Sequence, residues 1–218
     1  MSIKKNQRTI IISVIAILLV ISISYTLLFH NETLPIYNPA DFNPELVDKS
    51  LHSTSENHTI SDFTLINQNG ETITQNAYQD KIYVADFFFT RCPSICPIMT
   101  DNMAKIQDAF LEDDDIMLLS LSVTPTIDSI SVLKEYAIKK GVLDNKWHIT
   151  TGNKKHIYNL ARKSYFAVVD ESDGGLQDFI HTPLFILIDK EKQIRGIYDG
   201  TNDDEVSRII NDIRILKN

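Results

Sequence analysis

Apolar residues follow two different periods along most of this chain, and the change from one period to the other predicts strands separated by helices. Nearly continuous apolar and aromatic runs at residues 82–89 and 116–123 are typical of strands that are buried on both faces of a sheet. Between these runs an apolar residue recurs every three or four positions, which predicts an amphipathic helix containing Ile95, Met99, Met103, Ile106 and Phe110.

The remaining predicted elements complete a fold in which strands and helices alternate. Further strands are expected at residues 63–66, 72–73, 147–150, 184–188 and 194–198, and further helices at 128–140, 154–165 and 203–216. Asn69-Gly70 suits a type I′ turn in a hairpin, and Gly141 suits the end of a helix. This order predicts an α/β sandwich with a mixed central sheet flanked by helices.

A separate apolar segment precedes this domain. Residues 10–29 contain no charged side chain, and as a helix they would extend roughly 30 Å, about the thickness of the hydrocarbon core of a bilayer. Lys4, Lys5 and Arg8 lie on its N-terminal side, whereas residues 30–48 contain four acids and no Lys or Arg. The positive-inside rule then predicts a single-pass transmembrane helix. A cleaved signal peptide is the alternative, but its apolar region is usually only about 7 to 15 residues long.

The expected division of the chain follows from this segment. Residues 1–9 form a cytoplasmic N-terminus, 10–29 the membrane anchor, 30–58 a linker with little regular structure, and 59–218 the folded domain. No organelle transit peptide precedes the anchor, and no cysteine follows it closely. We therefore expect a bacterial inner-membrane protein whose C-terminal domain faces the periplasm or another extracytoplasmic space.

Composition and charge agree with one globular domain besides the anchor. The 218 residues are 43% hydrophobic and 23% charged, which is enough to bury one ordinary core. The formal net charge is -8, and because the cations at positions 4, 5 and 8 precede the anchor, residues 30–218 carry -11. This acidity disfavours nucleic acid as a partner.

The chain contains two cysteines, Cys92 and Cys96, directly after the first buried strand. As a structural disulfide the pair would be weak, because closing a loop of five residues contributes only about 2 kcal/mol in the chain-entropy model. Pro97 belongs in a first helical turn, so a helix should begin close by, capped by Ser94. The positive end of that helix and the adjacent Arg91 favour thiolates, and two soft thiolates select Cu(I) or Zn. Such a pair needs a third ligand.

Among six histidines, His181 has the best context for that ligand, since it stands at the entry to a buried strand. From the residues alone, a hydrogen-bonded histidine of the core is the competing interpretation. Met99 and Met103 are candidate thioether ligands, but their spacing fits the apolar stripe of the helix, which favours a role in the core.

With these residues in place, the sequence resembles the Sco/SenC family of copper-handling proteins used in cytochrome c oxidase assembly. The resemblance covers about residues 59–218. Its most specific part is an aromatic-rich strand followed by the pattern T-x-C-P-x-x-C-P, here at residues 86–97. Supporting matches lie at residues 121–125, 132–136, 147–152, 181 and 187–189.

The resemblance implies a thioredoxin-like fold with Cys92, Cys96 and His181 as ligands of one copper ion, either Cu(I) or Cu(II). It also implies delivery of copper to the binuclear copper site of cytochrome c oxidase subunit II or to another copper protein. The same cysteines would exchange electrons with the cysteines of that partner. Because a disulfide cannot act as two thiolate ligands, metal binding and oxidation exclude each other.

Three further positions bear on the chemistry of the site. Thr124 stands where the family usually has aspartate, which casts doubt on any role of that carboxylate. Asp86 lies six residues before Cys92, where thioredoxins place a buried aspartate, and we expect it either to accept a proton during thiol exchange or to be a hydrogen-bonded structural residue. Thr182-Pro183 resembles the cis-proline element of thioredoxins, although the isomer does not follow from the sequence.

Four functions are open at this point. The leading one is a membrane-anchored copper chaperone without turnover of its own, and the second is a periplasmic thiol-disulfide oxidoreductase. A thioredoxin-fold peroxidase and a thiol or copper sensor complete the set. Copper uptake by the reduced protein, and its dependence on His181, distinguish the first function from the second.

Overall fold

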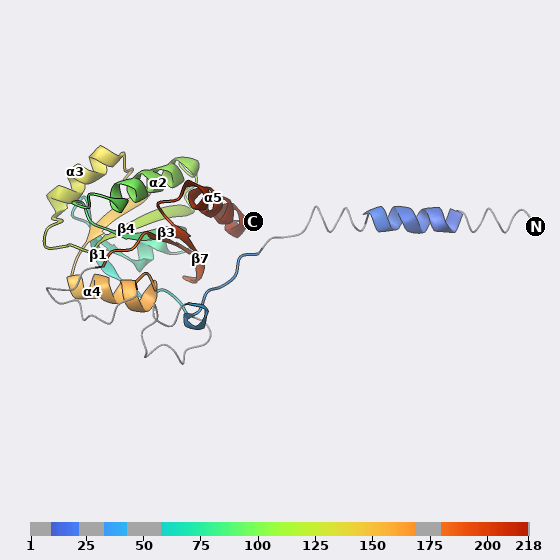
Figure 1. Cartoon of the computed structure of the whole chain (residues 1–218), viewed down its shortest axis with the longest axis horizontal. Coiled ribbons are helices and arrows are strands. Elements are labelled where there is room, and N and C mark those ends of the chain that lie inside the picture. Colours follow the sequence, from blue (N-terminus) through green and yellow to red (C-terminus); the bar gives the residue numbers. More distant parts are fainter. Residues whose placement is uncertain (1–9, 22–32, 43–57, 169–179, 218) are drawn as a thin grey trace, which may run out of the picture. The chain divides into compact units, whose positions relative to one another are not determined.

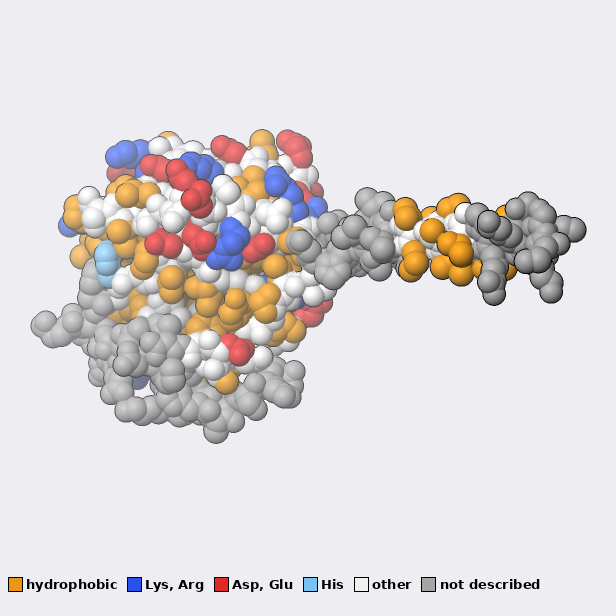
Figure 2. All heavy atoms as spheres, turned by 45° about the vertical axis from the view of Figure 1, so that its right-hand side comes forward, with side chains coloured by type: hydrophobic (Ala, Val, Ile, Leu, Met, Phe, Trp, Pro, Cys, Tyr) orange, Lys and Arg blue, Asp and Glu red, His pale blue; other side chains and the backbone are white. Residues whose placement is uncertain are grey.

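The computed structural model describes residues 10–21, 33–42, 58–168 and 180–217, which belong to two compact units, Met1–Thr33 and Leu34–Asn218. In the first unit, residues 10–21 form a helix whose side chains are almost entirely apolar (Figure 2). No helix among the described residues combines the length and the hydropathy needed to cross a bilayer. The other parts of the predicted cytoplasmic segment and anchor, residues 1–9 and 22–29, lie outside the described residues.

The second unit is built on one mixed sheet of seven strands (Figure 1). The strands stand in the order β2 (Thr72–Thr74), β1 (Thr64–Asn67), β5 (Trp147–Thr151), β4 (Ile116–Ser122), β3 (Ile82–Phe88), β6 (Leu184–Ile188) and β7 (Ile194–Asp199). The central strands β3, β4 and β5 are parallel, and all other neighbouring pairs are antiparallel. Hairpins therefore form both edges, and helical crossovers connect the centre.

Helices cover both faces of this sheet (Figure 1). α2 (Ile95–Ala109), α3 (Ile130–Lys140) and α5 (Asp203–Lys217) pack on one face, and α4 (Lys154–Asn159) with the π-helix η5 (Leu160–Ser164) packs on the other. Two 3₁₀ helices, η1 (Pro39–Asp41) and η4 (Gln75–Tyr78), complete the elements of the described residues. This arrangement confirms the predicted sandwich with a mixed, thioredoxin-like sheet.

Strand β3 serves both halves of the core. All of its residues are buried. Tyr83 and Phe87 pack into the apolar cluster beside α4, whereas Val84 and Phe88 pack into the cluster beside α2. Because side chains alternate along a strand, Asp86 also faces α2, the helix that follows the cysteines.

The hairpin turn between β1 and β2 differs from the predicted type I′ turn. Gly70 has a positive φ of 79°, but Asn69 does not, and a type I′ turn requires the left-handed conformation at both central residues. Instead, the Gly70 amide bonds to the Asn67 carbonyl at 3.0 Å, and Asn67 Oδ1 accepts from the amides of Asn69 and Glu71. The Asn67 side chain therefore stabilises a turn with one glycine in the left-handed region.

The helix expected at residues 154–165 has two parts. After α4 ends at Asn159, η5 follows as a π-helix, and the Tyr165 amide reaches back five residues to the Leu160 carbonyl at 2.9 Å. Leu160, Ser164 and Tyr165 are all buried, so the wider turn brings these three side chains to the core. The other predicted strands and helices of the domain agree with the structure within one or two residues at each end.

The second unit includes part of the expected linker. Residues 34–42, which we call the docked arm, belong to this unit. The Tyr37 amide bonds to the Ile194 carbonyl at 2.8 Å beside β7, and the Arg195 guanidinium donates to two further carbonyls of the arm. The folded unit therefore begins earlier in the chain than the expected residue 59. Residues 43–57 of the predicted linker lie outside the described residues.

Candidate metal and thiol site

The two cysteines lie where β3 leaves the sheet and α2 begins. Both are free thiols and buried, with 6% of Cys92 and 2% of Cys96 exposed. Ser94 precedes the helix as predicted, but its side chain accepts no capping hydrogen bond. Instead, the Cys96 amide donates to Cys92 Sγ at 3.4 Å. The sulfur therefore stands where a capping oxygen would, at the positive end of α2.

This arrangement separates the acidities of the two thiols. Burial raises the pKa of Cys92, but hydrogen bonds from the amides of Cys96 and Ser94 and from the His181 side chain outweigh burial and lower the pKa to about 6. Burial raises the pKa of Cys96 to about 12, and its contact with Cys92 adds to the rise. At neutral pH the metal-free protein therefore presents one thiolate, Cys92, and one thiol, Cys96.

Folding brings His181 to these cysteines from 89 positions along the chain. It stands just before β6, which pairs with β3 beside the cysteine loop. Its Nε2 lies 4.0 Å from Cys92 Sγ, and its ring centroid lies 6.1 Å from that of Phe89. The imidazole is exposed, while its neighbours Ile180 and Thr182 are buried. His181 therefore presents an exposed imidazole beside the buried sulfur of Cys92.

Two of the three predicted ligands, Cys92 and His181, stand at a distance that fits one soft metal ion. Thiolate sulfur and imidazole nitrogen bond such ions at about 2.3 Å and about 2.0 Å, so two ligands of one ion stand at most about 4.3 Å apart. The 4.0 Å between Cys92 Sγ and His181 Nε2 lies inside this limit. Within the described ranges, no three His, Cys, Asp or Glu side chains are gathered closely enough to hold a metal ion. By chemistry, two sulfurs and an imidazole favour Cu(I) or Zn over hard cations.

Asp86 lies on the α2 face of β3 and is 1% exposed. Its Oδ1 accepts from Ser120 Oγ at 2.5 Å, and the same hydroxyl accepts from Trp147 Nε1 at 2.9 Å. Burial raises the pKa of Asp86 to about 7, although the hydrogen bond from Ser120 opposes the rise. The carboxyl group is thus hydrogen-bonded and also able to bind a proton near neutral pH. Both of its predicted roles are compatible with these surroundings.

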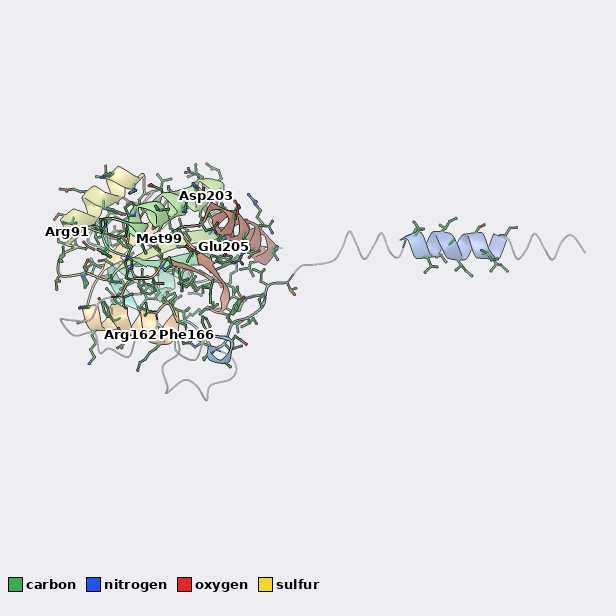
Figure 3. All side chains as sticks on the ribbon, viewed as in Figure 1. Arg91, Met99, Arg162, Phe166, Asp203 and Glu205 are labelled. Carbon is green, nitrogen blue, oxygen red and sulfur yellow. The ribbon has the colours of Figure 1, made fainter. Side chains whose placement is uncertain are left out.

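The methionines and the proline near the site have defined places. Met99 and Met103 are fully buried in the apolar cluster that also contains Cys96, which confirms their role in the core. Figure 3 shows Met99 inside the domain and Arg91 at its edge. No cis peptide bond occurs among the described residues, so the bond between Thr182 and Pro183 is trans.

Asp128 lies near the cysteines, a place that the sequence did not predict for it. It was expected in a helix, but α3 begins at Ile130, because Ser129 caps it by accepting the Val132 amide at 3.5 Å. Asp128 is therefore left in the preceding loop, where its carboxylate accepts from the Thr90 hydroxyl at 2.6 Å. The one signal in the sequence was that Asp128 follows Thr124, the position that departs from the family pattern, by four residues.

A second polar contact reaches the backbone of Cys96. The Thr100 hydroxyl donates to the Cys96 carbonyl at 2.7 Å and shares another hydrogen bond of 2.7 Å with the Tyr136 hydroxyl. Tyr136 belongs to α3, so this contact joins α3 to the first turn of α2. Tyr136 lies inside an ordinary predicted helix, so the sequence carried no signal for this role.

Known proteins agree with this arrangement of elements. The chain matches the family described as SCO1/SenC over residues 52–217. It is 31% identical over 160 residues to the SCO1 protein homolog of Bacillus subtilis, which covers 72% of this chain and 82% of that protein. Among solved structures, it is similar to BsSco, described as a member of the Sco family of cytochrome c oxidase assembly proteins with a disulfide switch, at 30% identity and a TM-score of 0.63, covering 73% of this chain and 94% of that one. It is also similar to Arabidopsis thaliana ScoI with copper bound, at 26% identity and a TM-score of 0.56, covering 71% and 97%.

Proposed function

This chain belongs to the SCO1/SenC family, and on that premise we propose that it binds one copper ion through Cys92, Cys96 and His181. The copper is cargo, delivered to the binuclear copper site of cytochrome c oxidase subunit II or to another copper protein. The copper-bound state of the similar Arabidopsis thaliana ScoI supports copper over zinc.

One observation carries this proposal. The His181 imidazole lies 4.0 Å from Cys92 Sγ although 89 positions separate them in the chain. The sulfur is a thiolate at neutral pH, because its pKa is lowered to about 6 by hydrogen bonds that outweigh burial. A charged sulfur with an imidazole beside it, and a second sulfur four positions along the chain, is the donor set that a soft ion takes.

A second candidate function is thiol-disulfide exchange with the cysteines of a partner, and the separation of the two thiol pKa values favours it. The Cys92 thiolate attacks one sulfur of a partner disulfide, forms a mixed disulfide and releases one partner thiolate. Cys96 then gives its proton to the partner thiolate already released and attacks the Cys92 sulfur, which releases the second partner thiolate. Two electrons pass to the partner, and Cys92 and Cys96 are left as a disulfide.

Residues 10–29 form the proposed membrane anchor, on the basis of their uninterrupted apolar sequence and the cations before it. The domain then faces the periplasm of a bacterial inner membrane, where an oxidising environment acts on both thiols. Fractionation tests this location: the full-length protein should stay with membranes in alkaline carbonate, and a variant without residues 10–29 should be released.

The copper proposal is tested with the reduced full-length protein in detergent. Cu(I) titration against a competing chelator should give one ion per chain, and His181→Ala should weaken binding by at least about tenfold. His156→Ala is the matched control, because the His156 ring lies elsewhere in the domain, where its Nε2 accepts from the Thr64 amide at 3.4 Å. An unchanged affinity in His181→Ala, or no stoichiometric uptake by the wild type, would show that the proposal is wrong.

The same variants separate the two functions. Cys92→Ser should abolish exchange with a disulfide substrate, because the reactive thiolate is lost. His181→Ala should leave most of that exchange intact while it weakens copper binding. If His181→Ala abolishes both activities equally, copper handling and exchange are not separable in this protein.

A further inference from the structure

Asp128 is buried beside the site, and the proposed function gives it no role. Its side chain is 0% exposed, and in the part of the chain that the structure describes no Lys or Arg forms an ion pair with it. Its carboxylate accepts four hydrogen bonds, from Thr90 Oγ1 (2.6 Å), Ser122 Oγ (2.5 Å), Thr124 Oγ1 (2.9 Å) and the Thr90 amide (3.3 Å). A buried carboxylate without a cation is costly unless its oxygens are satisfied, and these donors satisfy them.

These donors come from two neighbouring strands at the point where their pairing ends. Phe88 and Ser122 are the last paired residues of β3 and β4. Beyond them the Asp128 carboxylate continues the connection, because it bonds Thr90 after β3 and Thr124 after β4. The two segments that leave the sheet are therefore held together by one side chain.

Thr90 connects this cluster to the thiols. It lies two residues before Cys92, and Asp128 holds both its amide and its hydroxyl. The segment then turns through a hydrogen bond from the Cys92 amide to the Phe89 carbonyl at 3.3 Å. Displacement of Thr90 would therefore move Cys92 Sγ away from the Cys96 amide, to which it is bonded at 3.4 Å.

We infer that Asp128 is a positioning residue for the site: through Thr90 it holds Cys92 Sγ against the Cys96 amide and within reach of His181. The part of this inference that concerns copper binding rests on the proposed function. The part that concerns the reactivity of Cys92 does not, because Asp128 acts on Cys92 in the metal-free protein as well.

The residue at position 124 fits this role. Thr124 Oγ1 donates to Asp128 Oδ2 at 2.9 Å. An aspartate at this position, as in the family pattern, would place a second carboxylate against the first, and one of the two would need a proton or a cation. Threonine supplies a donor instead, so the cluster keeps one negative charge that is satisfied by hydroxyl and amide groups alone.

The decisive variants change Thr90 and leave Asp128 in place. Thr90→Val removes the hydroxyl at nearly constant volume, and Thr90→Ser keeps it. Two properties of the full-length reduced protein are measured: the rate at which iodoacetamide modifies Cys92 at pH 7 without metal, and the sulfur-to-copper charge-transfer absorption after addition of Cu(II). Thr90→Val should slow the modification about tenfold and shift the absorption band. The variant loses the hydrogen bond from the Thr90 hydroxyl to the Asp128 carboxylate, so Cys92 Sγ is no longer held against the Cys96 amide. Thr90→Ser should stay within about twofold of the wild type.

Asp128→Asn should behave like Thr90→Val, and Asp212→Asn is its matched control. Asp212 is also buried and accepts a hydrogen bond, from the Tyr198 hydroxyl at 2.8 Å, but it belongs to α5. Should Thr90→Val and Asp128→Asn lower the unfolding free energy in urea yet keep the wild-type modification rate and absorption band, the inference is wrong and Asp128 only stabilises its loop. If Asp128→Asn does not fold, the Thr90 pair decides. If the wild type takes up no copper, the proposed function fails, and the modification rates still decide the inference.

Discussion

At the scale of single residues, the chemistry of Cys92 depends on the groups that point at its sulfur. The Cys96 amide lies 3.4 Å away and His181 Nε2 lies 4.0 Å away, and both stabilise a negative charge. Both cysteines belong to the apolar cluster with Met99 and Met103, but at Cys96 burial outweighs the other influences and disfavours the charged form. Two cysteines four positions apart thus have different chemistry.

The first prediction concerns this difference. At pH 7 in the reduced, metal-free protein, iodoacetamide should modify Cys92 first, with a rate that rises through a midpoint near pH 6. Cys96 should stay largely unmodified, because burial raises its pKa to about 12. Mass spectrometry of the peptide that carries each cysteine in single Cys→Ser variants measures both rates. Equal rates for the two thiols would contradict the arrangement at the start of α2.

The second prediction concerns Asp86 and the dependence of stability on pH. Burial raises the pKa of Asp86 to about 7, so the folded protein keeps a proton that the unfolded chain releases near pH 4. Between these values the folded state binds more protons, and its unfolding free energy falls by about 1.4 kcal/mol for each pH unit, or about 4 kcal/mol in all. Asp86→Asn removes this loss, because an amide does not titrate in this range. The amide oxygen can still accept the hydrogen bond from Ser120.

Urea unfolding at pH 4.5 and pH 8 measures this effect as the difference between wild type and Asp86→Asn. All other titrating groups are common to both proteins and cancel in the difference. The variant should therefore gain stability relative to the wild type as the pH rises. A difference that is the same at both pH values would show that Asp86 is ionised in the folded protein.

At the scale of elements, the docked arm shows how a segment without periodicity is held. Arg195 donates to the carbonyls of Leu34 (2.6 Å) and Pro35 (3.0 Å) and forms an ion pair with Asp189 at 2.8 Å. Phe42 is 7% exposed and packs against a second aromatic ring in the core. Both hydrogen bonds from Arg195 to the arm go to backbone carbonyls, which any sequence offers, so the residue pattern did not predict them.

The third prediction tests the arm through its guanidinium. Arg195→Ala removes two hydrogen bonds to the arm and leaves Asp189, only 4% exposed, without its cation, so we expect a loss of about 3 kcal/mol in unfolding free energy. Hydrogen exchange at the Tyr37 amide should accelerate more than exchange in β6. Arg214→Ala, which changes an exposed arginine of α5, should cost under about 1 kcal/mol. If exchange at Tyr37 does not change, Arg195 does not hold the arm.

The strands and helices themselves were predictable, because hydrophobic period, turn residues and helix caps act over a few positions. The exceptions arose where a side chain or a tertiary contact replaced the local rule. Asn67 supports the hairpin turn in place of a second left-handed residue, and η5 widens so that Tyr165 is buried. Ser129 is the N-cap of α3, so Asp128 lies before the helix and accepts a hydrogen bond from Thr90.

At the scale of the whole molecule, the state of the thiols and the stability of the fold are linked. A ligand that binds only the folded, reduced protein stabilises it by an amount that grows with its concentration. Oxidation joins the two sulfurs in a disulfide, which removes both cysteines from the proposed ligand set. In the proposed function, metal and disulfide therefore compete for the same folded protein.

The fourth prediction follows from this linkage. Cu(I) at about a thousand times its dissociation constant should raise the unfolding free energy of the reduced protein by about 4 kcal/mol. The oxidised protein should show no such rise, and neither should a variant with both cysteines changed to serine. Urea midpoints with buffered Cu(I) measure all three. Equal stabilisation of the oxidised protein would place the copper at some other site.

The sequence by itself determined the order of strands and helices, the place of both thiols at a helix start, and the family to which the chain belongs, because these features depend on neighbours within a few positions. Only the tertiary structure decided which thiol is acidic, that Asp128 holds Thr90 across 38 positions, and that Arg195 holds Leu34 across 161. For His181, the family resemblance implied the meeting with Cys92, and the structure gives its distance of 4.0 Å. Such contacts depend on how the sheet and its helices pack together. A local pattern carries no record of that packing, so only the folded protein reveals these contacts.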